Sequence, residues 1–150
     1  MRLFCDEMLV GLARWLRAAG DDTALAEPGT QDADILALAE AEDRLLVTRD
    51  RRLAGRAGRA VLLTEDRVED QARDLGERTG LDWRAAPFTR CVVDNAPLRP
   101  ATREERDAVP PQARGLPGPF RACPDCGRLY WPGSHVRRMS ERLERLARNG

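Results

Sequence analysis

Short apolar runs alternate with amphipathic segments along the first half of the chain. Four runs have the length and composition of buried strands, at residues 2–5 (RLFC), 23–26, 45–48 (LLVT) and 60–63. Segments with apolar residues at helical spacing lie between and after them, at residues 8–19, 34–42, 51–56 and 68–79. Strands that alternate with helices predict an α/β fold, with a parallel sheet covered by helices on both faces.

Turn residues suggest where the helix at 34–42 begins. The stretch GTQD directly precedes it, and Thr30 or Asp32 is expected to cap its N-terminus.

The pattern changes after about residue 86. Residues 98–119 are rich in proline and poor in large apolar side chains, which predicts an exposed connection with one short helix capped by TREE at 102–105. RLYW at 128–131 resembles a hairpin strand, and 136–148 is an amphipathic helix. We therefore predict two parts, an α/β domain over residues 1–86 and a small cysteine-bearing module over residues 87–150.

Composition limits the class of protein. A chain of 150 residues suits one core domain with a small appendage. No apolar run is long enough to span a bilayer and the first residues do not resemble a signal peptide, so we expect a cytoplasmic protein that is not bound to a membrane.

Charge is unevenly distributed although the formal net charge is zero. Residues 1–86 carry 13 arginines against 18 acids, and residues 87–150 carry 12 arginines against 7 acids. An acidic part suits a metal ion and a basic part suits phosphates, but ordinary surface solvation explains the same charges.

Carboxylates follow several of the predicted strands. Asp6, Asp50 and the pair Glu65 and Asp66 each come just after a strand, and Asp34 lies at the start of a helix. In an open α/β sheet, ligands bind beyond the carboxyl ends of the strands. Carboxylates gathered there would hold magnesium or manganese, which can activate water against a phosphodiester. The alternative is that Asp6 and Asp34 cap helices and Asp50 caps a turn.

Arginines near these acids are candidates for binding phosphate. Arg49 and Arg51 flank Asp50, and Arg14 lies on the first predicted helix. Guanidinium groups form strong paired hydrogen bonds with phosphate oxygens, so we expect these three residues to contact a nucleic acid substrate.

The cysteines indicate a metal site. CPDCG at 123–127 places Cys123 and Cys126 two residues apart, the spacing of a zinc knuckle, and Cys91 offers a third ligand. The fourth ligand is either Asp94, which follows Cys91 at the same spacing, or His135, the only histidine.

Two further functions of this module are compatible with its residues. A redox pair is disfavoured because CPDC does not open a helix after a strand, so the zinc would be structural. Trp131 and Arg137 could stack on bases and hold phosphates, although Trp131 could equally pack the ribbon. Cys5 is expected to be a buried apolar residue of the first strand.

Three stretches in order carry a family resemblance: CDEMLVGLARWLRAAGDDT, DADILALAEAEDRLLVTRD and CPDCGRLYWPGSH. Together they resemble the Mut-seven C-terminal RNase domain family, a PIN-like nuclease domain with a zinc ribbon, from Arg2 to about Arg138. The resemblance implies a ribonuclease that uses magnesium or manganese, with Asp6, Asp34 and Asp50 as the metal-binding acids. The family usually has a second cysteine where this chain has Asp94.

Three functions follow from these observations. The first is a metal-dependent endoribonuclease whose substrate is RNA. The second is a non-catalytic module that binds RNA or protein through a structural zinc ribbon. The third, a small α/β protein that binds an anionic metabolite, is disfavoured by the acidic sheet edge and by the lack of a glycine-rich phosphate loop.

Overall fold

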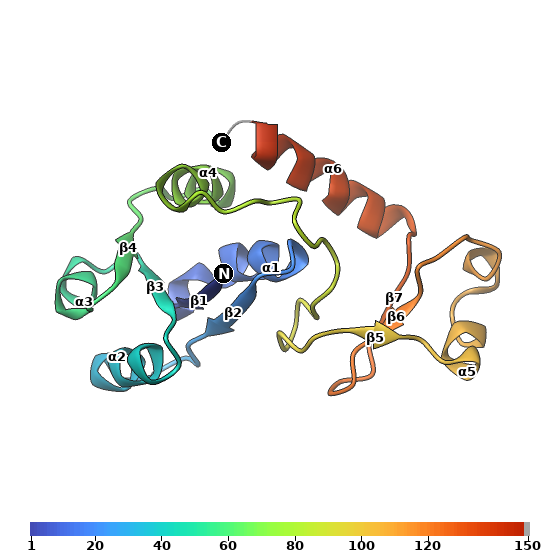
Figure 1. Cartoon of the computed structure of the whole chain (residues 1–150), viewed down its shortest axis with the longest axis horizontal. Coiled ribbons are helices and arrows are strands. Elements are labelled where there is room, and N and C mark those ends of the chain that lie inside the picture. Colours follow the sequence, from blue (N-terminus) through green and yellow to red (C-terminus); the bar gives the residue numbers. More distant parts are fainter. Residues whose placement is uncertain (149–150) are drawn as a thin grey trace.

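The structure, a computed structural model, describes residues 1–148 and contains two sheets (Figure 1). The larger sheet has four parallel strands in the order β2-β1-β3-β4. Their bounds are β1 Arg2–Cys5, β2 Asp22–Leu25, β3 Leu45–Thr48 and β4 Ala60–Leu62. The last two residues of the predicted second module lie outside the described residues.

Helices cover both faces of this sheet, so the predicted α/β class with a parallel sheet between helices is confirmed. The helices that belong to it are η1 Glu7–Leu9, α1 Val10–Ala18, α2 Asp32–Ala41, α3 Arg51–Arg56 and α4 Val68–Thr79. The first predicted helix therefore begins with a 3₁₀ turn. Asp6 caps this turn by accepting a hydrogen bond from the backbone N–H of Met8.

The predicted cap of α2 is wrong. Its N-cap is Gln31, whose side chain makes no capping bond, and Asp32 already lies inside the helix. Thr30 instead donates its hydroxyl hydrogen to the carbonyl oxygen of Glu27, 2.6 Å away. This bond closes the turn that precedes α2, so Thr30 does not cap the first turn of the helix.

Alternate residues of β1 enter two different cores. Leu3 and Cys5 pack with α1 and α4 on one face, where Cys5 is fully buried as expected. Phe4 packs with residues of α2 and α3 on the other face. Strands buried on both faces need continuous apolar runs, which is why these strands were visible in the sequence.

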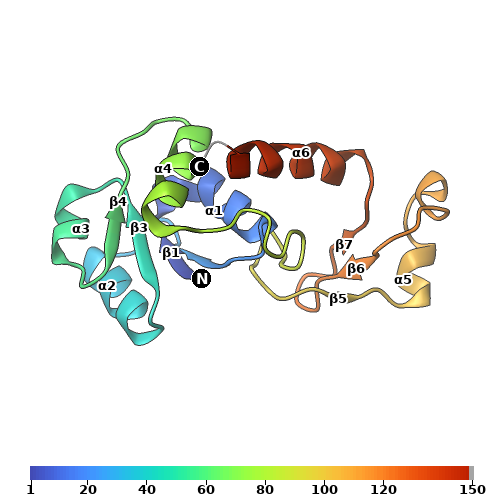
Figure 2. The same ribbon diagram turned by 45° about the horizontal axis from the view of Figure 1, so that its top comes forward.

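The C-terminal helix α6, Ser134–Arg148, returns from the small sheet to the α/β core (Figures 1 and 2). Leu143 and Leu146 are buried in the same cluster as Leu12 and Leu75. The helix thus joins the two parts, and the division at residue 86 stays a prediction. None of the described helices is long and apolar enough to cross a membrane.

The smaller sheet is antiparallel, in the order β5-β6-β7, with β5 Arg99–Pro100, β6 Arg121–Ala122 and β7 Leu129–Tyr130. The segment 98–119 also contains α5 Arg103–Asp107 and η2 Pro111–Ala113. Thr102 and Glu105 form the predicted capping box of α5. The expectation of an exposed connection is wrong at Val109 and Ala113, which are buried and form a small cluster with Phe120.

Candidate functional site

The carboxyl ends of β1 and β3 place two of the predicted acids beside one buried threonine. The backbone N–H of Asp6 donates to the carbonyl oxygen of Val47 at 3.2 Å, which holds Asp6 against the end of β3. The hydroxyl of Thr48 donates to Oδ2 of Asp6 and accepts from the backbone N–H of Asp50 at 3.0 Å. Asp6 and Thr48 are buried, whereas Asp50 is exposed. Thr48 therefore ties the two acidic positions together at one edge of the sheet.

Both acids also cap backbone N–H groups, as the alternative interpretation expects. Oδ1 of Asp50 accepts from the N–H groups of Arg52 and Leu53, at 2.9 and 3.2 Å, and so caps α3. Oδ1 of Asp6 accepts from Met8 at 3.0 Å. Oδ1 of Asp50 accepts both capping bonds, so its other oxygen, Oδ2, can bind a ligand while the cap stays in place.

Asp34 is exposed in the first turn of α2, which begins at the same sheet edge because α2 follows β2. The β2–α2 loop lies against η1, since Gly29 donates its N–H to Oε2 of Glu7 at 3.0 Å. Within residues 1–148, however, Asp6, Asp34 and Asp50 do not form a set of ligand atoms that all lie within 4.8 Å. Magnesium in proteins is usually held by one or two carboxylates and by water, so this spacing is compatible with such an ion.

The predicted phosphate-binding arginines are divided between two regions. Arg49 and Arg51 flank Asp50 at the acidic edge, and Nη2 of Arg49 lies 2.5 Å from Oδ1 of the exposed Asp66. Nε of Arg49 is buried and has no hydrogen-bond partner within the described residues. Arg14 on α1 and Arg137 on α6 are exposed. Arg14 lies on the side of the molecule toward the small sheet, in a cavity lined also by Trp131 and His135.

The cysteine module contains two short turns, which we call the first knuckle (residues 91–96) and the second knuckle (residues 123–128). They have the same backbone hydrogen bonds. Cys91 accepts at its carbonyl from the N–H of Asn95 at 2.9 Å, and Cys123 accepts from Gly127 at 3.0 Å. Asn95 and Gly127 both have positive φ angles, 71° and 76°.

The acid of the first knuckle stands where the second knuckle has a cysteine. Each first cysteine also donates its N–H to the carbonyl oxygen five residues later, that of Ala96 or Arg128, at 2.9 Å. By this correspondence Asp94 occupies the position of Cys126.

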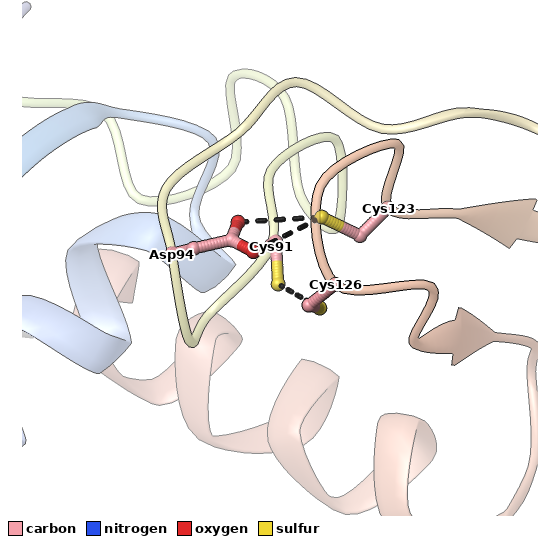
Figure 3. A group of neighbouring side chains, drawn as sticks. All are labelled: Cys91, Asp94, Cys123 and Cys126. Carbon is pink, nitrogen blue, oxygen red and sulfur yellow. Dashed lines mark hydrogen bonds between the residues drawn. The ribbon is translucent and has the colours of Figure 1, made fainter.

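Within residues 1–148, the side chains of these knuckles form the one group of three or more potential metal ligands that lie this close together (Figure 3). Ligand atoms of Cys91, Asp94, Cys123 and Cys126 all lie within 4.8 Å of one another. Sγ of Cys91 and Sγ of Cys126 are 3.8 Å apart, and both carboxylate oxygens of Asp94 are 3.3 Å from Sγ of Cys123.

These separations suit zinc. Bond lengths of about 2.3 Å to sulfur and 2.1 Å to oxygen at tetrahedral angles give about 3.8 Å between two sulfurs and 3.6 Å between sulfur and oxygen. His135 is exposed on α6 and is not in this group.

The electrostatics of the group also favour a cation. Burial and the neighbouring Asp94 carboxylate raise the pKa of the Cys123 thiol to about 12. Burial would raise the pKa of Cys91 as well, but hydrogen bonds from the Tyr130 hydroxyl and from backbone amides lower it below its usual value. Three thiolates and a carboxylate at this spacing would repel one another, so a bound cation would be needed to keep the thiols ionised.

The first knuckle is fastened to the α/β core by buried polar groups. Arg17 of α1 donates to the carbonyl oxygens of Val92 and Val93 at 3.2 and 2.9 Å and to that of Thr23 at 2.9 Å. Asn95 accepts from the N–H of Thr23 at 2.9 Å. Because Arg17 is only 7 % exposed, its charge serves this docking rather than a substrate.

Asp22 makes the stability of this contact between the first knuckle and the α/β core depend on pH. Burial alone would raise the pKa of Asp22, but hydrogen bonds from Arg44 and Asn95, both at 2.7 Å, lower it from 3.8 to about 2. A carboxylate whose folded pKa lies below its unfolded value stabilises the fold above the unfolded pKa and loses this stabilisation as the pH falls through the folded pKa. The full difference corresponds to roughly 2 kcal/mol.

We therefore expect the wild type to lose more free energy of unfolding between pH 5 and pH 2 than the Asp22→Asn variant, measured by urea unfolding at each pH. Equal losses in the two proteins would contradict this assignment.

Comparison with known families settles to which family this arrangement belongs. Residues 1–143 match the Mut7-C RNAse domain. The chain belongs to that family. The match spans both the acidic sheet edge and the two knuckles, so in this member of the family both sites belong to the matched region. No curated protein and no solved structure matches the chain.

Two residues that matter in this Mut7-C chain were missed as site residues from the sequence. Thr48 lies at the end of a predicted strand, and its position just before the acidic turn is the sequence signal for its role. Asn95 was overlooked beside Asp94, although asparagine is enriched at positive φ angles and often follows such a turn.

Proposed function

We propose that the chain is a metal-dependent endoribonuclease that cleaves RNA at the carboxyl edge of the parallel sheet. The observation that carries the proposal is the bridge from Asp6 through Thr48 to Asp50, found in a chain that belongs to an RNase domain family. Asp6 is buried, and hydrogen bonds hold both acids in place. Such preorganisation suits a site where charge develops during reaction.

The donor set of this edge fits magnesium or manganese. Asp6, Asp50 and Asp34 offer carboxylate oxygens, which are the ligands these ions prefer. Once bound, such an ion supplies a water nucleophile at neutral pH and charge stabilisation for the phosphate. Thr48 has a positioning role, since its hydroxyl fixes the Asp6 carboxylate and the backbone of Asp50.

The remaining residues would bind the substrate. Arg49 and Arg51 flank the acids and would hold the phosphates next to the cleaved bond. Arg14, Trp131 and Arg137 would contact nucleotides further along the strand. The knuckles would hold a structural zinc ion, because two-residue strands and a small apolar cluster bury too little to fold alone.

One observation favours the second candidate, a non-catalytic RNA-binding module. Asp6 and Asp50 each cap a helical turn, so both have a structural use that needs no metal. The two functions differ in one result. A ribonuclease should release products from labelled RNA only with added magnesium or manganese, whereas a binding module should retain intact RNA under the same conditions.

A further inference from the structure

Two neighbouring cavities beside the small sheet and α6 share two aromatic lining residues, Tyr130 and Trp131, here called the aromatic wall. Tyr130 packs against the buried cysteines, and Trp131 packs against the cluster of Val109, Ala113 and Phe120. The first cavity, of about 290 Å³, is lined among others by Arg14, Tyr130, Trp131 and His135. The second, of about 270 Å³, is lined by Arg121 and by the same Tyr130 and Trp131. Each volume is close to the lower limit for a small-molecule site, which suits one planar group per cavity.

Among the described residues, no carboxylate lines either cavity, although the chain has as many acids as arginines. Their charged residues are Arg14, Arg128 and Arg121. In contrast, the cavity between α2 and α3 includes Glu40 and Asp43. The paired cavities thus combine aromatic walls with positive charge alone, which is the composition of sites that bind single-stranded nucleic acid.

The aromatic wall is held by its surroundings. The hydroxyl of Tyr130 donates to Sγ of Cys91 at 3.2 Å and accepts from the N–H of Val92 at 3.0 Å, so a metal ligand orients this ring. Gly133 packs against Trp131, and a Cβ atom there would lie 2.9 Å from Nε1 of the indole. The wall is therefore preorganised, which lowers the entropic cost of binding a ligand.

We propose that the paired cavities bind two bases of single-stranded RNA, one on each side of the wall formed by Tyr130 and Trp131. The proposal rests on the proposed ribonuclease function and names where its substrate is held outside the acidic edge. Arg14 would hold the phosphate beside the first base. At about 1.5 Å per helical residue, Arg14 lies on the order of 10 Å from Asp6 along the first helix. The bound bases would thus lie away from the acidic edge, on the side of the molecule where Asn95 contacts Thr23 near the start of β2.

Fluorescence anisotropy with a labelled single-stranded RNA twelve-mer tests this proposal. The protein is zinc-loaded and carries Asp50→Asn, so that binding is measured without cleavage. Trp131→Ala should weaken binding at least fivefold, because stacking on one base is worth roughly 1–3 kcal/mol. Arg14→Gln should lower the slope of log Kd against log salt by about 0.7, the value for one phosphate contact with a single strand.

Two controls separate the site from general basicity and from misfolding. Arg103→Gln removes an exposed arginine on α5 that lines neither cavity, and it should leave the affinity for RNA within about twofold of the parent protein. An abasic twelve-mer of equal charge needs no change in the protein. It should bind to the parent at least as weakly as the intact RNA binds to the Trp131→Ala variant, because it lacks both bases.

The outcomes are distinct from those of the cleavage assay. Equal binding of the abasic and intact RNA would overturn the base-binding proposal even if the wild type cleaves RNA. Weaker binding by Trp131→Ala and by the abasic strand would support it even in a protein that does not cleave. Equal losses in Arg14→Gln and Arg103→Gln would assign the affinity to general charge and overturn the role of Arg14.

Discussion

Replacing Asp50 with asparagine is expected to abolish metal-dependent RNA cleavage and leave the fold intact. Asparagine is as good an N-cap as aspartate, so the bonds to Arg52 and Leu53 persist and the free energy of unfolding should change by less than about 0.5 kcal/mol. The neutral amide is a poor ligand for magnesium compared with a carboxylate. We therefore expect the cleavage rate to fall by more than about 100-fold, measured with labelled RNA.

Asp50→Ala is the matched variant for the capping role. It removes the cap together with the carboxylate, and should lower the free energy of unfolding by about 1 kcal/mol in urea unfolding. If Asp50→Asn cleaves RNA at the wild-type rate, Asp50 acts only as a helix cap and is not part of the cleavage site.

Replacing Cys123 with serine is expected to remove the metal and destabilise the cysteine module. Cys123 is buried and directly follows β6, and its Sγ belongs to the group of atoms that would hold the zinc ion. The module has little apolar core, so the binding energy of the metal would contribute directly to folding. We expect zinc content to fall toward zero by elemental analysis. The midpoint of thermal unfolding should fall by about 6–12 °C, since a loss of roughly 3 kcal/mol shifts it by 2–4 °C per kcal/mol in a chain of this size.

Asp94→Cys is the matched control, because Asp94 occupies the same place in its knuckle as Cys126 does in the other. A thiolate suits zinc better than a carboxylate, so this variant should keep its zinc in a higher concentration of a competing chelator. An unchanged melting curve for Cys123→Ser, or weaker zinc binding by Asp94→Cys, would contradict a structural zinc held by these four residues.

The apolar runs predicted every strand end of the parallel sheet to within one residue. A strand that is buried on both faces needs apolar side chains at nearly every position, which makes it easy to recognise in the sequence. The strands predicted at 2–5 and 45–48 therefore coincide with β1 and β3. The small cluster of Val109, Ala113 and Phe120 was missed for the opposite reason. Its members are separated by prolines and glycines and show no period, so only the folded chain brings them together.

The candidate site was predictable where it follows local rules. The two cysteines of CPDC and the acids after β1 and β3 are adjacent to features that sequence patterns reveal. Arg17 shows the limit of such patterns. It lies on a helix like any surface arginine, and only its contacts with carbonyl oxygens 75 and 76 residues away make it a buried docking residue.

Cleavage of labelled RNA by the zinc-loaded protein tests the central claim most directly. Single-stranded and hairpin RNAs would be incubated with magnesium, with manganese or with neither. Wild type would be compared with Asp50→Asn, and zinc content measured after each reaction so that loss of the structural ion is not mistaken for loss of activity. The account predicts products from the wild type only, and only with magnesium or manganese. Intact RNA that remains bound to a zinc-loaded wild type, or equal cleavage by both proteins, would contradict a metal-dependent site at the acidic sheet edge.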